Sequence, residues 1–236
     1  MEELETFRCL ESVEEEQLES TNYGIICSYY YIKVETLYNF QKRIAQDMKL
    51  DHIFDVLSGA AELDQYQFGP SSGTKIGTLL LQTATKPKNR VHGLLLLYLH
   101  RIEMPKEILE ECRAMVPLCL KLTHAMIDVV SSLGYLRAVI YCTQFCQMLV
   151  QAMWIHESAL LQVLDRHTVT VLEQQYNIKE IADFVEMDDE ERRKVLKGKD
   201  IDKIASACNR YPSLSLSAQL TDYSAEEATM VVTLEH

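Results

Sequence analysis

The longest helix-forming stretch of this chain runs from Pro105 to Trp154 and has one clear break, at Gly134. Proline fits the first turn of a helix, because its missing N–H needs no partner there, so Pro105 is expected to open a helix that reaches Ser132. Pro117 inside this helix should kink or divide it. Because the 236 residues include only 8 Gly and 5 Pro, the sequence predicts a mainly α fold.

Shorter helical segments lie on both sides of this stretch. Thr21 is a suitable N-cap for the first of them. Residues 67–77 contain three Gly, one Pro and two Ser and are expected to form a loop. From the spacing of apolar residues, helices are predicted over 23–32, 34–46, 50–61, 78–84, 88–101, 136–154, 158–164, 168–175, 178–186, 188–197 and 201–209.

The spacing of apolar residues changes after Pro212, from a helical to an alternating pattern. Leucines alternate with polar residues over 214–220, and residues 230–234 are rich in strand-forming types. These two segments are predicted to pair as a short β hairpin. The last three residues, 234–236, resemble the remnant of a purification tag and are set aside from the functional argument.

Negative charge is concentrated at the N-terminus. The net charge is −12, and eight Glu with one Arg stand among the first 20 residues. This segment is expected to be solvated and loosely ordered, and the rest of the chain is close to neutral. An acidic chain is a poor general binder of nucleic-acid phosphates, although a local basic surface stays open.

Neither a membrane span nor an export signal is expected. No run of 18 apolar residues occurs, so no transmembrane helix is predicted, and an acidic N-terminus does not fit a signal or transit peptide. The seven Cys are an odd number at mostly apolar positions. They predict free buried thiols in a reducing compartment.

Two patterns resemble phosphate or metal motifs but fit them poorly. Gly69 and Gly73-Thr74-Lys75 lack the spacing of a P-loop, and no strand is expected before them. The acidic run 188–191 is typical of the first turn of a capped helix, where carboxylates complement the helix dipole. The sequence therefore predicts a connector and a solvated helix rather than ligand sites.

Two further pairs could suggest a metal or a catalytic site. Cys142 and Cys146 share a helix face but lack the paired spacing of zinc ligands. His124 and Asp128 have no evident nucleophile and no group to orient them. No catalytic residue, cofactor or metal is therefore expected in this chain.

Four lysines surround Gly198, between two predicted helices. The turn weakly resembles a helix-hairpin-helix, whose backbone N–H groups can meet a phosphate. A solvated basic face is the simpler interpretation. The candidate RNA contacts are Lys194, Lys197, Lys199 and Lys203.

An apolar stripe ends the helix predicted over 136–154. Core packing is its simplest interpretation, but methionine-rich surfaces also bind partner helices. The candidate core or partner-binding residues are Met148, Met153 and Trp154.

Six strings stand in a characteristic order along the chain: GIICSYYYI (24–32), DVLSGAAE (55–62), IDVVSSLGYL (127–136), QAMW (151–154), EMDDEER (186–192) and CNRYPSLSLS (208–217). Together they resemble the Sec63-type unit that follows the motor core of Ski2-like superfamily-2 RNA helicases. The resemblance covers about residues 20–220 and is strongest to the C-terminal cassette of the large spliceosomal U5 helicases.

The resemblance implies an order of domains. After the acidic segment (1–19), which composition sets apart, the resemblance implies a ratchet-like helical bundle (20–156) and a helix-loop-helix domain (157–212). Residues 213–236 would begin a truncated immunoglobulin-like β-sandwich. In the family the ATP site lies on motor lobes that this chain lacks, so the fragment itself is not expected to be an enzyme. The implied partners are the motor domains of a parent helicase and spliceosomal proteins, in the nucleus and without a membrane.

Two departures from active cassettes favour a non-catalytic, protein-docking module. Residues 66–70 carry no basic residue where active cassettes often have an arginine, and the ratchet-like helix 106–133 has a net charge of −1. The alternative is an RNA-contacting ratchet unit, for which the four lysines, Arg137 and Arg90 would form one positive groove. A self-standing enzyme and the homologous unit of the endoplasmic reticulum translocon are further alternatives, but no acid–base pair, membrane span or J-domain supports them.

Overall fold

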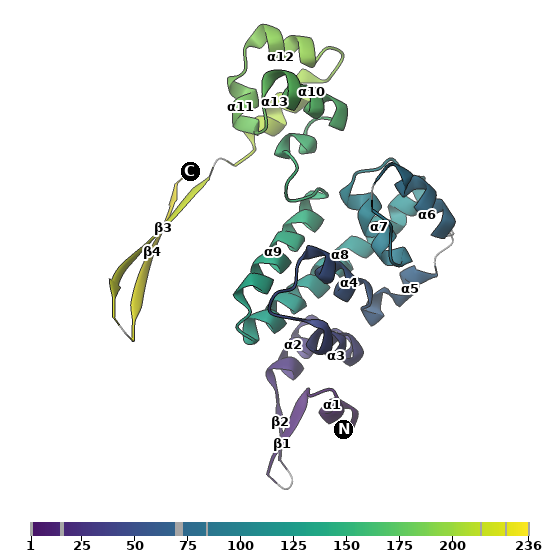
Figure 1. The fold of residues 1–236 in the computed structure, drawn as a ribbon, viewed down its shortest axis with the longest axis vertical. Coiled ribbons are helices and arrows are strands. Elements are labelled where there is room, and N and C mark those ends of the chain that lie inside the picture. Colours follow the sequence, from purple (N-terminus) through teal and green to yellow (C-terminus); the bar gives the residue numbers. More distant parts are fainter. Residues whose placement is uncertain are drawn as a thin grey trace. The chain divides into compact units, whose positions relative to one another are not determined.

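The computed structural model describes residues 2–14, 17–68, 73–83, 85–212, 214–224 and 226–235. Most of them lie in helices, accompanied by two short antiparallel hairpins, so the predicted mainly α fold is confirmed. The chain divides into unit 1, Met1–His156, and unit 2, Glu157–His236 (Figure 1). Each unit has its own hydrophobic core. The roles expected for these segments, ratchet bundle and helix-loop-helix domain, remain predictions.

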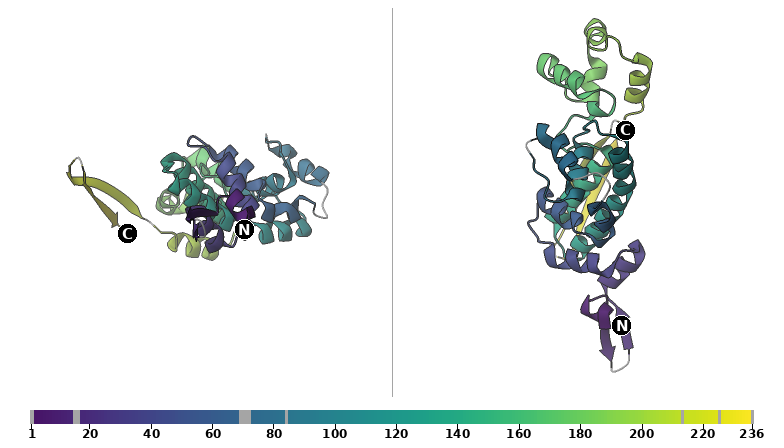
Figure 2. Two further views of the ribbon diagram at one scale, coloured as in Figure 1. Left: turned by 90° about the horizontal axis from the view of Figure 1, so that it is seen from below. Right: turned by 90° about the vertical axis from the view of Figure 1, so that its right-hand side faces the viewer.

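The acidic N-terminal segment is folded against unit 1, contrary to the expectation that it is loosely ordered. α1 (Glu2–Thr6) leads into a hairpin of β1 (Leu10–Glu14) and β2 (Gln17–Ser20), which lies at one end of the unit (Figure 2). Cys9 is buried, and the Phe7 ring meets the Tyr38 ring edge-on at a centroid distance of 5.0 Å. Apolar residues between the glutamates thus anchor the segment.

The predicted helices of unit 1 are present, most of them ending two or three residues earlier than expected. Thr21 caps the first, as predicted, because its hydroxyl accepts a 3.1 Å hydrogen bond from the Gly24 amide. The elements are α2 (Asn22–Tyr30), α3 (Val34–Arg43), α4 (Leu50–Ser58), η1 (Ala61–Leu63), α5 (Asp64–Gln67), α6 (Gly73–Leu79), η2 (Leu80–Gln82), α7 (Arg90–Leu99), α8 (Lys106–Ser132) and α9 (Leu136–Gln151).

The loop predicted over 67–77 is partly helical, because α6 begins at Gly73; residues 69–72 lie outside the described residues. α6 packs closely on α7. A Cβ atom added to Gly93 of α7 would lie 2.6 Å from Ile76 Cγ2. Burial of the Ile76 side chain compensates for the poor helix propensity of glycine in α6, and composition alone does not reveal this packing.

α8 and α9 form an antiparallel pair in unit 1, joined at Gly134, whose φ of +71° suits glycine (Figure 1). α8 is continuous through Pro117, so the prediction that Pro117 could divide the helix is wrong. Pro117 lies on the exposed face of α8, where water can bond the carbonyl that the proline leaves free. The buried face of α8 consists of Ile108, Cys112, Met115, Cys119, Leu122, Thr123, Ala125, Met126, Val129 and Val130.

Among the described helices, α8 alone is long and apolar enough to cross a membrane by length and composition. The sequence prediction, which considered unbroken apolar runs, missed this property. The apolar residues of α8 pack against neighbouring helices in the core of unit 1. A core helix passes the same test of length and composition, so the finding is weak evidence for a span.

Unit 2 begins with a cluster of short helices, close to the predicted segments. Aspartates cap three of them: Asp165, Asp188 and Asp200 each accept a hydrogen bond from a backbone amide in the first turn. The interpretation of the acidic run 188–191 as a capped helix start is thereby confirmed. The elements are η3 (Ala159–Gln162), α10 (Arg166–Tyr176), α11 (Ile181–Glu186), α12 (Asp189–Val195) and α13 (Ile201–Asn209).

The predicted C-terminal hairpin is present as β3 (Ser215–Tyr223) and β4 (Ala228–Glu235). Leu216 pairs with Leu234 and Leu220 with Met230, so one face of the hairpin is apolar and exposed. The pairing includes Leu234 and Glu235, which the sequence analysis set aside as a tag remnant; they are strand residues in this fold.

Candidate functional site

Glu62, the last residue of the string over 55–62, joins α3 to η1. The Glu62 carboxylate accepts hydrogen bonds from the Lys33 amide at 2.6 Å and the Thr36 hydroxyl at 2.5 Å, and the Thr36 hydroxyl accepts one from the Ala61 amide at 2.9 Å. Glu62 therefore satisfies the open N-terminus of α3 and fixes it to η1. In this structure Glu62 serves to hold the fold together.

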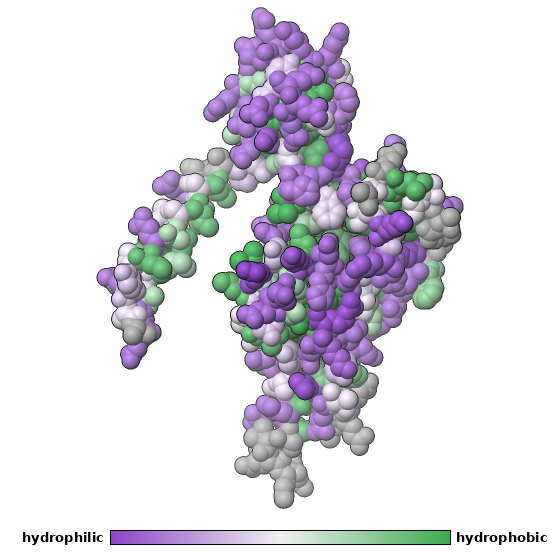
Figure 3. All heavy atoms as spheres, in the orientation of Figure 1, coloured by the Kyte–Doolittle hydropathy of each residue, from purple (hydrophilic) through white to green (hydrophobic). Residues whose placement is uncertain are grey.

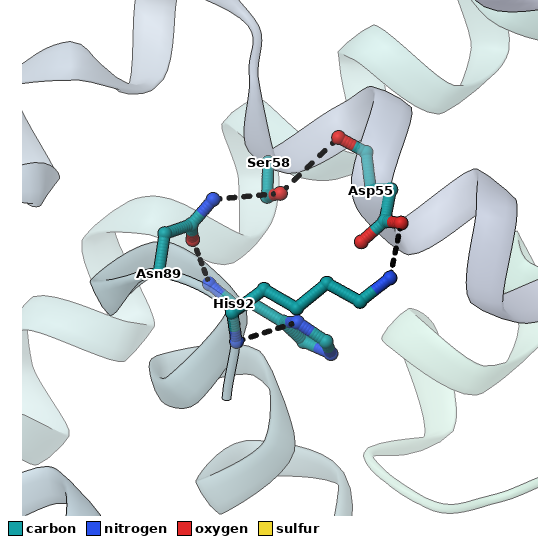
Figure 4. Close-up of polar contacts among 5 residues, drawn as sticks. Asp55, Ser58, Asn89 and His92 are labelled. Atoms are coloured by element: carbon teal, nitrogen blue, oxygen red, sulfur yellow. Dashed lines mark hydrogen bonds and ion pairs between the residues drawn. The ribbon is translucent and has the colours of Figure 1, made fainter. Parts of the chain in front are cut away.

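A second polar network joins the end of α4 to the start of α7 (Figure 4). Asn89 caps α7 by accepting a 2.8 Å bond from the His92 amide, and its side-chain amide donates to the Ser58 hydroxyl at 3.0 Å. Lys88 forms an ion pair with Asp55 and donates its amide to His92 Nδ1 at 3.3 Å. Burial lowers the pKa of His92, so its ring stays neutral and accepts this bond.

Arg90 forms a buried ion pair between α7 and α8. Its guanidinium meets both oxygens of Glu111 at 2.5 and 2.6 Å and also donates to the Tyr66 carbonyl. The two charged side chains are 6 % and 13 % exposed. Arg90 is therefore not available to the continuous positive groove that the RNA-contacting alternative was expected to need.

The middle of the exposed face of α8 is more positive than the net charge of the whole helix suggested. Glu111 is paired with Arg90, and Asp128 accepts a 2.8 Å hydrogen bond from the Tyr30 hydroxyl. No Asp or Glu occurs over residues 112–127. The outward-facing or half-exposed ionisable residues of that stretch are Arg113, Lys121 and His124.

The C-terminal end of α2 lies beside this face of α8. The Lys121 ammonium donates to the Tyr31 carbonyl at 3.4 Å, and the Tyr30–Asp128 bond fixes the same junction. Tyr29 meets the Tyr30 ring edge-on at 4.9 Å. The rings of Tyr29 and Tyr31 are 74 % and 88 % exposed, a surface that the sequence analysis missed although the run of three tyrosines was visible.

Trp154 and its two neighbouring methionine candidates belong mainly to the core. Met148 and Met153 are buried, so they pack in the core of unit 1, which was the simplest interpretation of the stripe. Trp154 is half-buried; its ring stacks on Phe54 at 5.8 Å, and its indole N–H donates to His100 Nδ1 at 3.3 Å.

The four lysines of unit 2 lie around one turn, at Gly198, whose φ is +82°. Lys194, Lys197 and Lys203 are exposed. Lys199 forms an ion pair with Asp165, which holds the pKa of that carboxyl well below its usual range. Three of the four lysines therefore carry exposed positive charges. Contact of the four lysines with RNA remains a prediction.

The described cysteines are free thiols, as predicted. Burial raises the pKa of Cys142 to about 12 and that of Cys146 to about 11, so neither is an activated nucleophile. His124 is exposed on α8, and Asp128 is bonded to Tyr30 rather than to it. Within the described residues no group of three or more His, Cys, Asp or Glu could hold a metal ion.

Comparison with known proteins gives the family of this chain. The model of the Sec63 Brl domain matches residues 20–236. The DExH-box ATP-dependent RNA helicase DExH12 of Arabidopsis thaliana is 29 % identical over 99 % of the chain, and the human U5 small nuclear ribonucleoprotein 200 kDa helicase is 27 % identical over 93 %. The chain spans only 12 % and 11 % of the length of these relatives. Since the family model covers nearly the whole chain, the chain belongs to the Sec63 Brl domain family.

Proposed function

We propose that this chain is a non-catalytic accessory module of an ATP-dependent RNA helicase that acts in pre-mRNA splicing. The observation that carries the proposal is the match to the Sec63 Brl domain over residues 20–236, together with helicase relatives along nearly the whole chain. ATP hydrolysis belongs to motor domains of the parent protein. In the bundle, by contrast, Glu62, Arg90 and Asp128 serve to join helices.

The expected partners are those motor domains and spliceosomal proteins, in the nucleus. The relatives named as helicases of the U5 small nuclear ribonucleoprotein support this assignment. The chain would dock onto its partners and regulate the helicase, with no cofactor of its own.

The outer face of α9 is well suited to docking. Along α9 the only charged residue is Arg137, near its start. Leu136, Ile140 and Val150 are 73 %, 49 % and 68 % exposed on the outer face, and Figure 3 shows hydrophobic surface along the edge of unit 1 where α9 lies. An uncharged helix face of this kind favours a protein partner over nucleic acid.

Binding to the motor domains tests this proposal. The 236-residue chain is titrated with separately purified motor domains of the parent helicase. Replacing Ile140 and Val150 by Glu should weaken binding at least about tenfold, as expected for apolar anchors of an interface. The matched control is Leu81→Glu, since Leu81 is 78 % exposed on η2. Equal binding by the double variant and the wild type would contradict docking through α9.

A second candidate function is RNA contact through α8. The acid-free stretch 112–127 with Arg113, Lys121 and His124 favours it. Titration with fluorescent single-stranded RNA at about 50 and 200 mM salt tests it, because counterion release predicts much weaker binding at the higher salt. Absence of binding at the lower salt would leave protein docking as the function of unit 1.

A further inference from the structure

Tyr31 has a backbone conformation that is unusual for a tyrosine. It follows the last residue of α2 with φ +48° and ψ +53°. Its amide and that of Ile32 both bond the Cys27 carbonyl and so close the helix. Glycine is the usual residue at such a left-handed position, because a Cβ atom is strained there. The Tyr31 side chain is 88 % exposed, so burial of its ring does little to offset the strain.

The other left-handed residues of unit 1 have local explanations. The Arg101 guanidinium donates to carbonyls at the end of α9, at 2.8 and 2.9 Å. The carbonyl of Arg8 accepts a 2.6 Å bond from the Thr21 hydroxyl, and the amide of Ala152 closes α9 on the Met148 carbonyl. The Tyr31 backbone is held in the same way, by its own cap bonds and by Lys121. What distinguishes Tyr31 is a large aromatic ring left in solvent at a strained position, and strained positions cluster at ligand-binding sites.

The surroundings of Tyr31 indicate the kind of ligand. Its carbonyl bonds the Lys121 ammonium, and a second exposed ring, that of Tyr29, stands two residues earlier on α2. Two acidic groups near this junction are occupied: Asp128 accepts from Tyr30, and Glu62 accepts from a backbone amide and a hydroxyl. Glu35, in the first turn of α3, is exposed. Exposed aromatic rings beside cations are the combination that binds single-stranded nucleic acid, by stacking with the bases and by attraction of the phosphates.

We propose that Tyr31, assisted by Tyr29, stacks with a base of single-stranded RNA whose phosphates follow Arg113, Lys121 and His124 along α8. The inference rests on the second candidate function, RNA contact through α8, and adds to it an aromatic platform contributed by α2. RNA is favoured over a protein partner at this place because the adjoining stretch of α8 carries cations and no acid. In this arrangement the strained tyrosine is retained for binding at the expense of stability.

Replacing Tyr31 by Gly separates binding from folding. Glycine suits the left-handed position, so the variant should melt at the same temperature as the wild type or up to about 3 °C higher. Its affinity for fluorescein-labelled single-stranded oligouridylate at about 50 mM salt should fall roughly five- to a hundredfold, the range for loss of one stacked base. Tyr31→Trp should keep the affinity. Phe68→Gly is the matched control, since Phe68 is 90 % exposed at the end of α5, and its RNA affinity should not change.

Each contrary outcome has its own meaning. If Arg113→Ala weakens RNA binding and Tyr31→Gly does not, the stacking platform is overturned while RNA contact through α8 stands. If the wild-type chain binds no RNA at about 50 mM salt, both are overturned, and the docking proposal is untouched. If Tyr31→Gly binds RNA normally but loses affinity for the motor domains, Tyr31 is a protein contact and the proposal is wrong.

Discussion

The Tyr30 hydroxyl donates a 2.8 Å hydrogen bond to the Asp128 carboxylate, joining α2 to the last turns of α8 across 98 positions of sequence. Burial and this bond raise the pKa of Tyr30 to about 12. The phenol therefore stays protonated as a donor, and the carboxylate is held as its acceptor. The bond fixes the α2 terminus that carries Tyr29 and Tyr31.

Replacing Tyr30 by Phe should lower the stability of unit 1. The ring remains, but the half-buried carboxylate loses its partner, at a cost of about 1.5–3 kcal/mol for a hydrogen bond to a charged group. Urea unfolding followed by the fluorescence of Trp154, the single tryptophan of the chain, measures the change. Tyr29→Phe is the control, since Tyr29 is 74 % exposed; an equal loss in both variants would contradict a specific role of the Tyr30 bond.

The Arg90–Glu111 pair predicts a larger effect. Arg90→Ala leaves a carboxylate that is 13 % exposed without its cation and should destabilise unit 1 by about 3–5 kcal/mol. The double variant Arg90→Met, Glu111→Leu should recover most of this loss, because apolar residues of similar size remove the unpaired charge. Tryptophan fluorescence in urea again provides the measurement. A double variant as unstable as Arg90→Ala would show that the ion pair itself is required.

Local features of this fold were predictable from sequence, and contacts between distant residues were not. Thr21 was identified as a cap because the capping bond spans three residues, and the C-terminal hairpin was identified because alternation is a local signal. The partners of Arg90 and Tyr30 lie 21 and 98 residues away. No local pattern brings such pairs together.

In the candidate site too, local features were predictable from the sequence and contacts between distant residues were not. The net charge of α8 suggested a helix unsuited to RNA, but net charge does not record which carboxylates are already bonded. The left-handed conformation of Tyr31 depends on how α2 ends and α3 begins. In the sequence Tyr31 appears only as the third of three consecutive tyrosines. The lysines around Gly198 were correctly placed at one turn, since that contact is local.

The buried His92 predicts a pH dependence for unit 1. Burial lowers its pKa in the folded state below the ordinary value of about 6.5. Below that pH the unfolded chain binds a proton that the folded chain resists, so stability should fall by up to about 1.4 kcal/mol per pH unit as pH drops. Urea midpoints measured from pH 7.5 to 5 test this dependence. In His92→Leu the slope attributable to this group should vanish; an unchanged slope would assign it elsewhere.

Trp154 gives a final test of whether its ring serves the core or a partner. The ring stacks on Phe54 and its N–H bonds His100, so Trp154→Ala should destabilise unit 1 by about 3 kcal/mol, the lower end for removal of a core aromatic. Trp154→Phe should lose less, because it keeps an aromatic ring against Phe54 and forfeits the hydrogen bond and part of the ring area. Thermal unfolding followed by far-ultraviolet circular dichroism measures both variants. Unchanged melting of Trp154→Ala, combined with loss of motor-domain binding, would instead identify the ring as an interface residue.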